Sequence, residues 1–228
     1  MPIQPFHRDT AVAFVDVSGF KQMMRNREKA MQTLANFYET GYFTLIDHRR
    51  NDGMSVEGLF VTDCGILFVR HQNQTSIEIV QTLLRAVEDL NRRLFAHNIE
   101  TTASIAFGDF RYSPLNEYDG MEKNYIFGDA YVDAFKDNGA TPKLEPGMCR
   151  VLVQGFNFNA DTRGVREHPI WSRCCREGGR LYFYWMCNDA GNVEQVKQRY
   201  EQANQSRFQV IHKTLQDCST TWATRGAT

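Results

Sequence analysis

Apolar residues form two kinds of pattern along the chain, and their alternation predicts the order of secondary structure. Short apolar runs rich in β-branched and aromatic residues predict strands at 11–17, 54–60, 64–69, 101–107, 149–154 and 180–187. Apolar residues that recur at helical intervals predict amphipathic helices at 20–38 and 76–97, a short helix at 129–137, and a long helix at 191–218 interrupted near Asn204–Gln205. The chain therefore combines helices and strands throughout.

The order β-α-β-β-α-β, followed by a helix and further strands, matches the ferredoxin-like split unit. This is an α+β fold, with an antiparallel sheet and helices packed on it. A length of 228 residues suits a single domain spanning 1–228, with a core at about 9–190 followed by the C-terminal helix. In this topology the first strand lies beside the central hairpin, so the end of that strand approaches the hairpin tip.

Two polar stretches interrupt these patterns, and both are predicted to be loops. Residues 108–124 contain Pro114, Gly120 and few periodic apolar residues, which favours a loop that covers a site. Residues 157–179 carry several arginines, which form either a solvated face or phosphate contacts from a partner subunit. These arginines are Arg163, Arg166, Arg173 and Arg176.

The charge balance argues against a nucleic-acid or membrane partner. Lys and Arg number 26 against 27 Asp and Glu, so no basic surface is predicted for a phosphate backbone or an anionic bilayer. A polymerase-like palm, which would need a basic track for its template, is disfavoured for the same reason. Met1–Thr10 lack the pattern of a secretion signal and no apolar run is long enough to span a bilayer, which predicts a cytoplasmic protein.

Cysteine spacing argues against a structural zinc site. The six cysteines include no Cys-x-x-Cys pair, and no histidine stands at a usual zinc-ligand offset. Cys64, Cys149 and Cys187 lie in strand-like runs and are predicted to be buried thiols in a reducing compartment. Cys174 and Cys175 fall in the second polar stretch, where no role is predicted for them.

Asp16 and Asp63 are the candidate metal ligands, because each stands in an apolar strand-like run. A carboxylate that loses its hydration is costly unless a cation or several donors replace the water. Either residue alone is equally well explained as a turn aspartate, since Ser18-Gly19 and Cys64-Gly65 suit chain reversals. Two such sites in one domain favour a shared cation, and oxygen ligands favour Mg²⁺ or Mn²⁺ over zinc.

The segment Val17-Ser18-Gly19-Phe20 leads from the first strand into the first predicted helix. Backbone N–H groups at a helix start attract anions, and Gly19 allows close approach, so the segment suits a polyphosphate beside Asp16. The alternative is a helix that Ser18 simply caps.

These residues resemble motifs of the class III nucleotidyl cyclases, the family of the adenylyl and guanylyl cyclases. The segment Phe-Val-Asp-Val-Ser-Gly-Phe at 14–20 is similar to that family's first metal motif, and Val-Thr-Asp-Cys-Gly at 61–65 to its second, where Gly-Asp is usual. Ser-Ile-Ala-Phe-Gly at 104–108 resembles the fourth-strand pattern, and Phe127-Gly128 with Ala134 the segment opening the next helix. The resemblance covers about residues 9–155.

The resemblance implies a two-metal reaction in which the ribose 3′ hydroxyl attacks the α-phosphorus and pyrophosphate leaves. Asp16 and Asp63 would bridge two Mn²⁺ or Mg²⁺ ions, and the carbonyl of Val17 would complete one shell. N–H groups from Ser18 to Phe20 would hold the phosphates. Sites of this family lie between two subunits, which implies a homodimer.

The sequence departs from the family at the positions that contact the base and the ribose. Leu59 stands where adenylyl cyclases have a lysine, and Tyr125 where they have a polar residue. Val132 replaces the usual ribose-orienting Asn, although Asp133 is adjacent, and Lys136 replaces the transition-state Arg. The residues expected around base and ribose are Phe14, Leu59, Tyr125, Val132 and Asp133. Arg150 is a further candidate for the triphosphate.

This pattern is most similar to the bacterial pyrimidine cyclases of the Pycsar antiphage systems. That resemblance implies conversion of UTP to cyclic UMP, a second messenger that acts through a separate effector. Cytidylate and adenylate cyclases are alternatives. A degenerate domain that binds a nucleotide without turnover is an alternative of another class.

Overall fold

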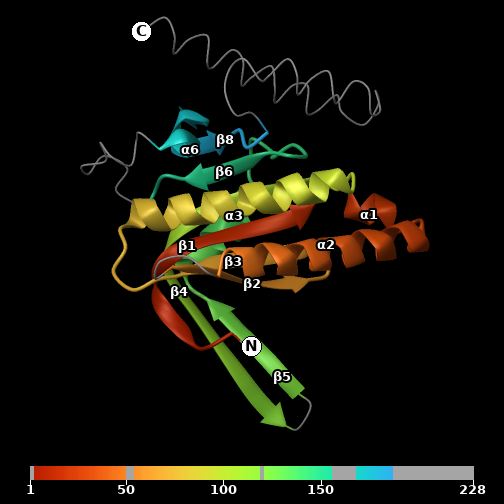
Figure 1. Cartoon of the computed structure of the whole chain (residues 1–228), viewed down its shortest axis with the longest axis horizontal. Helices are drawn as coiled ribbons and strands as arrows, with labels where there is room; N and C mark the ends of the chain where they lie inside the picture. Colours follow the sequence, from red (N-terminus) through yellow and green to blue (C-terminus); the bar gives the residue numbers. More distant parts are fainter. Residues whose placement is uncertain (1–2, 50–53, 119–120, 156–167, 187–228) are drawn as a thin grey trace, which may run out of the picture.

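The computed structural model describes residues 3–49, 54–118, 121–155 and 168–186. Within them the chain forms one sheet of eight strands in the order β2-β3-β1-β4-β6-β8-β7, with β5 paired to β4 (Figure 1). The strands are β1 (Phe6–Val17), β2 (Ser55–Val61), β3 (Cys64–Arg70), β4 (Thr101–Tyr118), β5 (Met121–Phe127), β6 (Cys149–Leu152), β7 (Cys174–Glu177) and β8 (Arg180–Phe183). The helices are α1 (Phe20–Met23), α2 (Arg27–Asp47), α3 (Ser76–Ala96), α4 (Asp129–Asn138) and α6 (Pro169–Ser172).

Strand β1 lies at the centre of the sheet, antiparallel to both β3 and β4. The α+β class and the predicted neighbourhood of the first strand and the central hairpin are therefore confirmed. The pairing between β4 and β6 is parallel, so the sheet is mixed rather than wholly antiparallel.

Helices α2 and α3 cover one face of the sheet and enclose the larger core (Figure 1). Ala11, Ala13 and Val15 of β1 point into this core, as alternation along a strand requires. Helix α3 begins with a capping box, in which the Thr75 side chain accepts from the Glu78 N–H and the Glu78 carboxylate accepts from the Thr75 N–H. None of the helices in the described ranges has the length and apolar character needed to cross a bilayer.

The helix predicted at 20–38 is wrong at its start. Helix α1 ends after one turn, and α2 begins at Arg27. The break occurs because the Asn26 side chain accepts a hydrogen bond from the Lys29 N–H at 3.1 Å and so caps a new helix.

Helix α4 lies on the opposite face of the sheet, with Ala130 and Ala134 fully buried against side chains that include Val12 and Phe14 of β1. Gly128, which precedes the helix, has φ 123°, and a Cβ there would lie 2.3 Å from the Asp109 carbonyl oxygen. The close approach of α4 to β4 therefore requires glycine at this position.

The loop predicted at 108–124 is wrong, because these residues form most of a long hairpin. Strand β4 continues to Tyr118 and pairs with β5, and the hairpin projects from the rest of the molecule (Figure 1). Phe110 and Tyr112 are buried at alternate positions on the α4 side of the sheet, which extends the strand past the polar residues. Pro114 is tolerated because it lies beyond the paired part of β1, where β4 pairs only with β5.

The loop predicted at 157–179 is also wrong where it is described, because it contains α6 and β7. Cys174 is buried in β7 and is not a loop residue, and Cys149 is buried as predicted. The prediction of a buried Cys64 is wrong, because Cys64 is the first residue of β3 and is only partly covered there. Arg173 donates two hydrogen bonds to Glu88 of α3, at 2.7 and 2.6 Å, so it serves this packing rather than a phosphate. Arg163, Arg166, Cys187 and the helix predicted at 191–218 lie outside the described residues.

Candidate functional site

Asp16 occupies the next-to-last position of β1, opposite Cys64 of β3 and Thr102 of β4. Its side chain points to the α4 side of the sheet, in alternation with Val15 and Val17. It is half-buried, and the Cys64 thiol donates a hydrogen bond to its Oδ1 atom at 3.2 Å.

Asp63 lies in the two-residue turn between β2 and β3, next to Thr62 at φ 54°. The Val17 N–H donates to the Asp63 carbonyl oxygen at 2.9 Å and ties this turn to the end of β1. Asp16 and Asp63, which are distant in sequence, are thereby held at the same end of neighbouring strands, as the sequence predicted.

The surroundings of Asp16 disfavour its ionised form. Burial raises the pKa of the Asp16 carboxyl above its ordinary value, the hydrogen bond from Cys64 opposes this rise, and the nearby Asp63 carboxylate adds to it. Burial and the bond to Asp16 raise the pKa of the Cys64 thiol to about 12, so the thiol stays a neutral donor. Within the described part of the chain, neither aspartate forms an ion pair with a lysine or arginine.

These residues fit a hard divalent cation. The described residues contain no group of three or more His, Cys, Asp or Glu side chains that suits a metal, so the candidate set is two carboxylates and the carbonyl of Val17. Mg²⁺ is commonly held by one or two carboxylates, with substrate phosphates and water completing its shell. Two neighbouring carboxylates without a counter-charge supply the negative charge that such an ion needs.

The 17–20 segment differs from the predicted phosphate seat in two respects. The Ser18 N–H donates to the Glu100 carbonyl oxygen at 2.9 Å, which leaves the Gly19 and Phe20 N–H groups as the candidates. Gly19, at φ 72°, is the N-cap of α1, so the alternative in which Ser18 caps the helix is wrong. With only four residues, α1 also adds little dipole to the site.

A cavity of about 340 Å³ opens beside Asp16. It is lined by the end of β1 and the residues after it, by Thr102, by the last residue of α4, and by the segment that links α4 to β6. The lining residues are Asp16, Ser18, Gly19, Thr102, Asn138, Gly139, Lys143, Leu144 and Pro146. The linking segment has no recognisable motif, so its residues were not predicted; only the fold brings them to Asp16.

Arg150 does not reach this cavity, and its prediction as a phosphate ligand is wrong for the described structure. Its side chain is fully buried, and Nε donates to the Asp137 Oδ2 atom at 2.6 Å. Its other nitrogens donate to the carbonyl oxygens of Pro142, Ala140 and Asp137. The guanidinium group therefore holds these parts of the fold together and is not directed at a ligand.

The residues predicted around base and ribose lie apart from the Asp16 cavity of their own chain. Val132, Asp133 and Lys136 are exposed on α4, and Phe14 packs beneath Phe135 with ring centroids 5.1 Å apart. None of the four lines the cavity.

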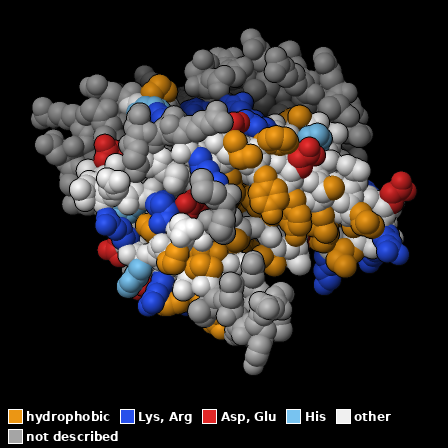
Figure 2. All heavy atoms as spheres, turned by 60° about the horizontal axis from the view of Figure 1, so that its bottom comes forward, with side chains coloured by type: hydrophobic (Ala, Val, Ile, Leu, Met, Phe, Trp, Pro, Cys, Tyr) orange, Lys and Arg blue, Asp and Glu red, His pale blue; other side chains and the backbone are white. Residues whose placement is uncertain are grey.

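Leu59 lines a separate cavity of about 690 Å³ between β2, α2 and the β4–β5 hairpin, with Tyr112 and Asn124. Tyr125 is exposed on β5. Hydrophobic side chains gather on one face of the molecule (Figure 2), and the exposed large hydrophobic residues include Tyr42, Ile46 and Val61 near this cavity.

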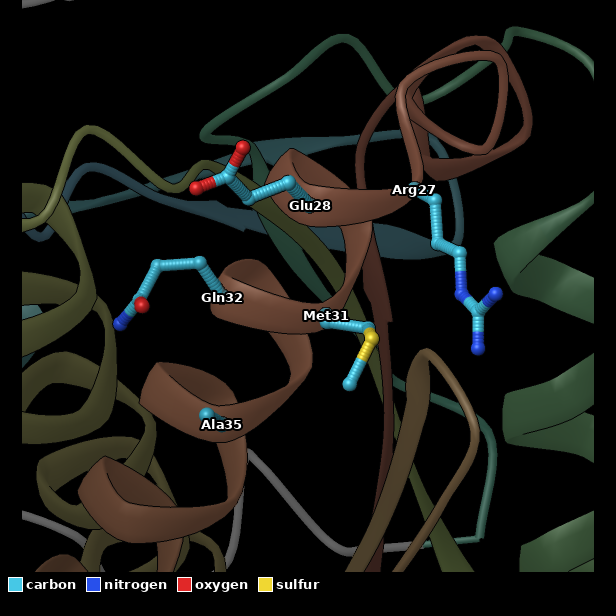
Figure 3. A pocket seen from close by; sticks show the side chains of 5 residues that line it. All are labelled: Arg27, Glu28, Met31, Gln32 and Ala35. Atoms are coloured by element: carbon cyan, nitrogen blue, oxygen red, sulfur yellow. The ribbon is translucent and has the colours of Figure 1, made fainter.

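A third hollow, of about 500 Å³, follows the first turns of α2 (Figure 3). Arg27 and Met31 point to one side of it, and Glu28 and Gln32 to the other. Because the polar groups do not converge, this hollow is not a candidate for the site.

Comparison with known proteins identifies the fold. No family model matches the sequence, and no curated protein is significantly similar to it. The guanylyl cyclase domain of the RhoGC fusion protein from the fungus Blastocladiella emersonii is similar in structure, with a TM-score of 0.56 and 10% identity over 80% of this chain and 98% of that one. The guanylate cyclase domain of RhGC from Catenaria anguillulae, in complex with GTP, has a TM-score of 0.54 and 10% identity over 79% and 98%.

A bacterial light-regulated adenylyl cyclase has a TM-score of 0.50 and 13% identity, covering 66% of this chain. The present chain spans only 44% of the length of that protein. At such identities the likeness concerns the fold alone. The chain therefore has the α+β fold of class III adenylyl and guanylyl cyclase domains.

Proposed function

We propose that the chain is a nucleotidyl cyclase whose metal-holding residues are Asp16 and Asp63. The observation that carries this proposal is that Asp16, which lines a cavity, lies close enough to Asp63 for the two carboxylates to repel, without a basic partner among the described residues, in a cyclase-type fold. A sensor domain without turnover would have no need to hold two like charges together.

The reaction joins the ribose 3′ oxygen to the α-phosphorus and breaks the bond from that phosphorus to the oxygen bridging to the β-phosphate. The hydroxyl proton passes to water, and pyrophosphate leaves. Two Mn²⁺ or Mg²⁺ ions would supply charge that lowers the pKa of the hydroxyl and neutralises negative charge on the leaving group. Cys64 holds Asp16 Oδ1, which orients the carboxylate, while the Gly19 and Phe20 N–H groups face the phosphates.

A homodimer completes this site in our proposal, with α4 of one subunit opposite the aspartates of the other. The exposed positions of Val132, Asp133 and Lys136, away from the Asp16 cavity of their own chain, support this arrangement. Lys136 would offer a point charge to the phosphorus rather than the bidentate fork of an arginine.

Mixing inactive variants tests the shared site. An Asp16→Asn subunit combined with a Lys136→Ala subunit should restore one intact site per mixed dimer. Combining Asp16→Asn with Asp63→Asn is the matched control and should restore none, because both lesions fall on the same half of a site. Equal inactivity of the two mixtures, with subunit exchange demonstrated, contradicts the shared site or the role of Lys136.

UTP is the substrate we favour, with cyclic UMP as a messenger for antiphage defence that acts on a separate effector. Support comes from apolar Leu59 in a cavity with Tyr112 and Asn124, where an adenine-reading lysine is missing. Aromatic side chains stack on a single-ring base without requiring purine contacts. CTP and ATP are the alternative substrates.

Product analysis tests activity and substrate together. The purified chain is incubated with each of the four nucleoside triphosphates and Mn²⁺, and products are identified by mass. We expect cyclic UMP above all, and none from the Asp16→Asn variant. Use of ATP as good as that of UTP contradicts the pyrimidine proposal, and CTP ahead of UTP contradicts only the choice of uracil. Nucleotide binding without any product favours the sensor alternative.

A further inference from the structure

We propose that Lys143, on the segment between α4 and β6, binds the pyrophosphate end of the nucleotide in the same subunit as Asp16. This inference rests on the proposed function, and it assigns the cavity beside Asp16 to the leaving group. The cavity volume of about 340 Å³ lies at the lower end of the ~300–1,000 Å³ typical of small-molecule sites, which suits part of a nucleotide rather than the whole.

The position of the charge is the first argument. Among the described residues that line the cavity, Lys143 is the one basic residue, and Asp16 lines it as well. In the described part of the chain Lys143 forms no ion pair. An ammonium group in the same cavity as a metal-holding carboxylate provides charge for an anion that also contacts the cation.

Two buried polar atoms in the same cavity lining are the second argument. Ser18 Oγ and Asn138 Oδ1 are both buried, and neither has a hydrogen-bond partner among the described residues. Buried polar atoms are rarely left unbonded, because their desolvation is costly. The hydroxyl can donate to a phosphate oxygen, and the Asn138 amide can do so when it turns its NH₂ group inward. The Ser18 hydroxyl and, in that orientation, the Asn138 NH₂ group then gain acceptors from the ligand that Lys143 attracts.

The third argument is that the segment carrying Lys143 is held in place before any ligand binds. Arg150 donates to the Pro142 carbonyl oxygen at 2.6 Å, directly before Lys143. At the other end, the Gly147 N–H donates to the Thr101 carbonyl oxygen at 2.9 Å, and the Trp185 indole donates to the Gly147 carbonyl oxygen at 2.7 Å. The backbone around Lys143 is therefore already ordered, and binding needs to order only its exposed side chain.

The chemistry gives this placement a purpose. Negative charge builds on the β-phosphate oxygens as the bond to the α-phosphorus breaks. A positive charge beside those oxygens stabilises the transition state more than the bound substrate. Lys143 would therefore raise both the rate of cyclisation and the affinity for the pyrophosphate product.

Calorimetric titration of the full chain with inorganic pyrophosphate in the presence of Mn²⁺ tests the inference. We expect Lys143→Gln to weaken pyrophosphate binding about tenfold or more, since it removes a charged hydrogen bond. Lys143→Arg should keep most of the affinity, because it keeps the charge. Lys29→Gln, which removes an exposed lysine of α2, is the matched control and should bind like the unmodified chain.

Two further readouts separate ligand binding from a merely structural role. The increase in melting temperature with Mn²⁺ alone should be the same in Lys143→Gln and the unmodified chain, because the aspartates are unchanged. In turnover, Lys143→Gln should lower kcat and weaken inhibition by pyrophosphate, and Lys143→Arg should restore both.

The outcomes distinguish this inference from the proposed function. Unchanged pyrophosphate affinity in Lys143→Gln overturns the inference, while cyclisation by that variant leaves the proposed function standing. If Lys143→Gln loses pyrophosphate affinity and the unmodified chain cyclises no triphosphate, the inference is supported and the proposed function is overturned.

Discussion

Two carboxylates on the α4 side of the sheet, Asp16 and Asp137, have opposite surroundings. Asp137 is almost fully buried, and Arg150 and Ser104 donate to its Oδ2 atom at 2.6 and 2.5 Å. Arg180 donates to its Oδ1 atom at 2.8 Å. Asp16 is half-buried, accepts one thiol hydrogen bond at 3.2 Å, and lies near a second carboxylate.

The difference separates a carboxylate that serves the fold from one that serves a ligand. The ionised form of Asp137 has a full complement of donors, so nothing needs to be added to it. The ionised form of Asp16 lacks such donors, and the fold holds it at a cost in stability. A divalent cation is what would complete it.

The largest expected effect is on activity. Asp16→Asn or Asp63→Asn should lower cyclisation about a thousandfold or more, equivalent to ~4 kcal/mol of transition-state stabilisation, because each removes a metal bridge. Initial rates with UTP and Mn²⁺ measure this loss. Near-normal turnover in either variant would contradict the assignment of that aspartate as a metal ligand.

The next effect concerns stability on the Asp137 side. Arg150→Met should lower the free energy of unfolding by about 3–5 kcal/mol, since it leaves a buried carboxylate short of its main partner. Urea denaturation measures the change. Adding Asp137→Leu should recover part of the loss, because the buried carboxylate is removed and only the partly exposed Arg180 loses a partner. A cost below about 1 kcal/mol for Arg150→Met would show that Asp137 is not held as the geometry implies.

A smaller change, of opposite sign, is expected at Asp16. Because burial and the neighbouring Asp63 raise the pKa of the Asp16 carboxyl, its ionised form is less favourable in the folded chain at neutral pH. Asp16→Asn should therefore raise the melting temperature without metal by roughly 1–3 °C. Mn²⁺ should stabilise the unmodified chain and have little effect on this variant. A lower melting temperature in Asp16→Asn without metal would contradict the cost assigned to this charge.

Asp89 of α3 offers an intermediate case and the smallest effect. Burial raises the pKa of the Asp89 carboxyl, but hydrogen bonds from His48 and Arg93 lower it further, so the net shift is downward. A lowered pKa means stability that is present above the ordinary carboxyl pKa and is lost as pH falls through the folded value. Asp89→Asn should cost less than about 1 kcal/mol at pH 7, because the pair is partly exposed. In urea denaturation at several pH values this cost should shrink below about pH 4; a constant cost would mean that the charge does not matter.

The sequence located Asp16 and Asp63 because each interrupts an apolar run, a local signal that needs no knowledge of the fold. Lys143 carries no such signal, since only the closure of the segment between α4 and β6 brings it to the cavity. Arg150 was misinterpreted for a related reason. A charged residue inside a strand requires a buried partner, and Asp137 could have been sought in the preceding helix.

The same distinction applies to the fold. The regular apolar spacing of 76–97 predicted α3 closely, because one face of that helix is fully buried. The hairpin of β4 and β5 was missed because its outer part extends past β1, so few apolar side chains mark it as a strand. Apolar spacing in the sequence predicts elements that pack against the core. An element that projects from the sheet buries few side chains, so its sequence shows little apolar spacing.

The central position of β1 also determines when the surroundings of Asp16 can form during synthesis. The strand leaves the ribosome before both of its neighbours, which are made from residues 64–68 and 101–112. An apolar strand with both hydrogen-bonding edges open is exposed to aggregation and to chaperones until those neighbours arrive. Nascent chains that stop before β4 should therefore be captured as incomplete sheets, with Asp16 still lacking the neighbour that carries Thr102.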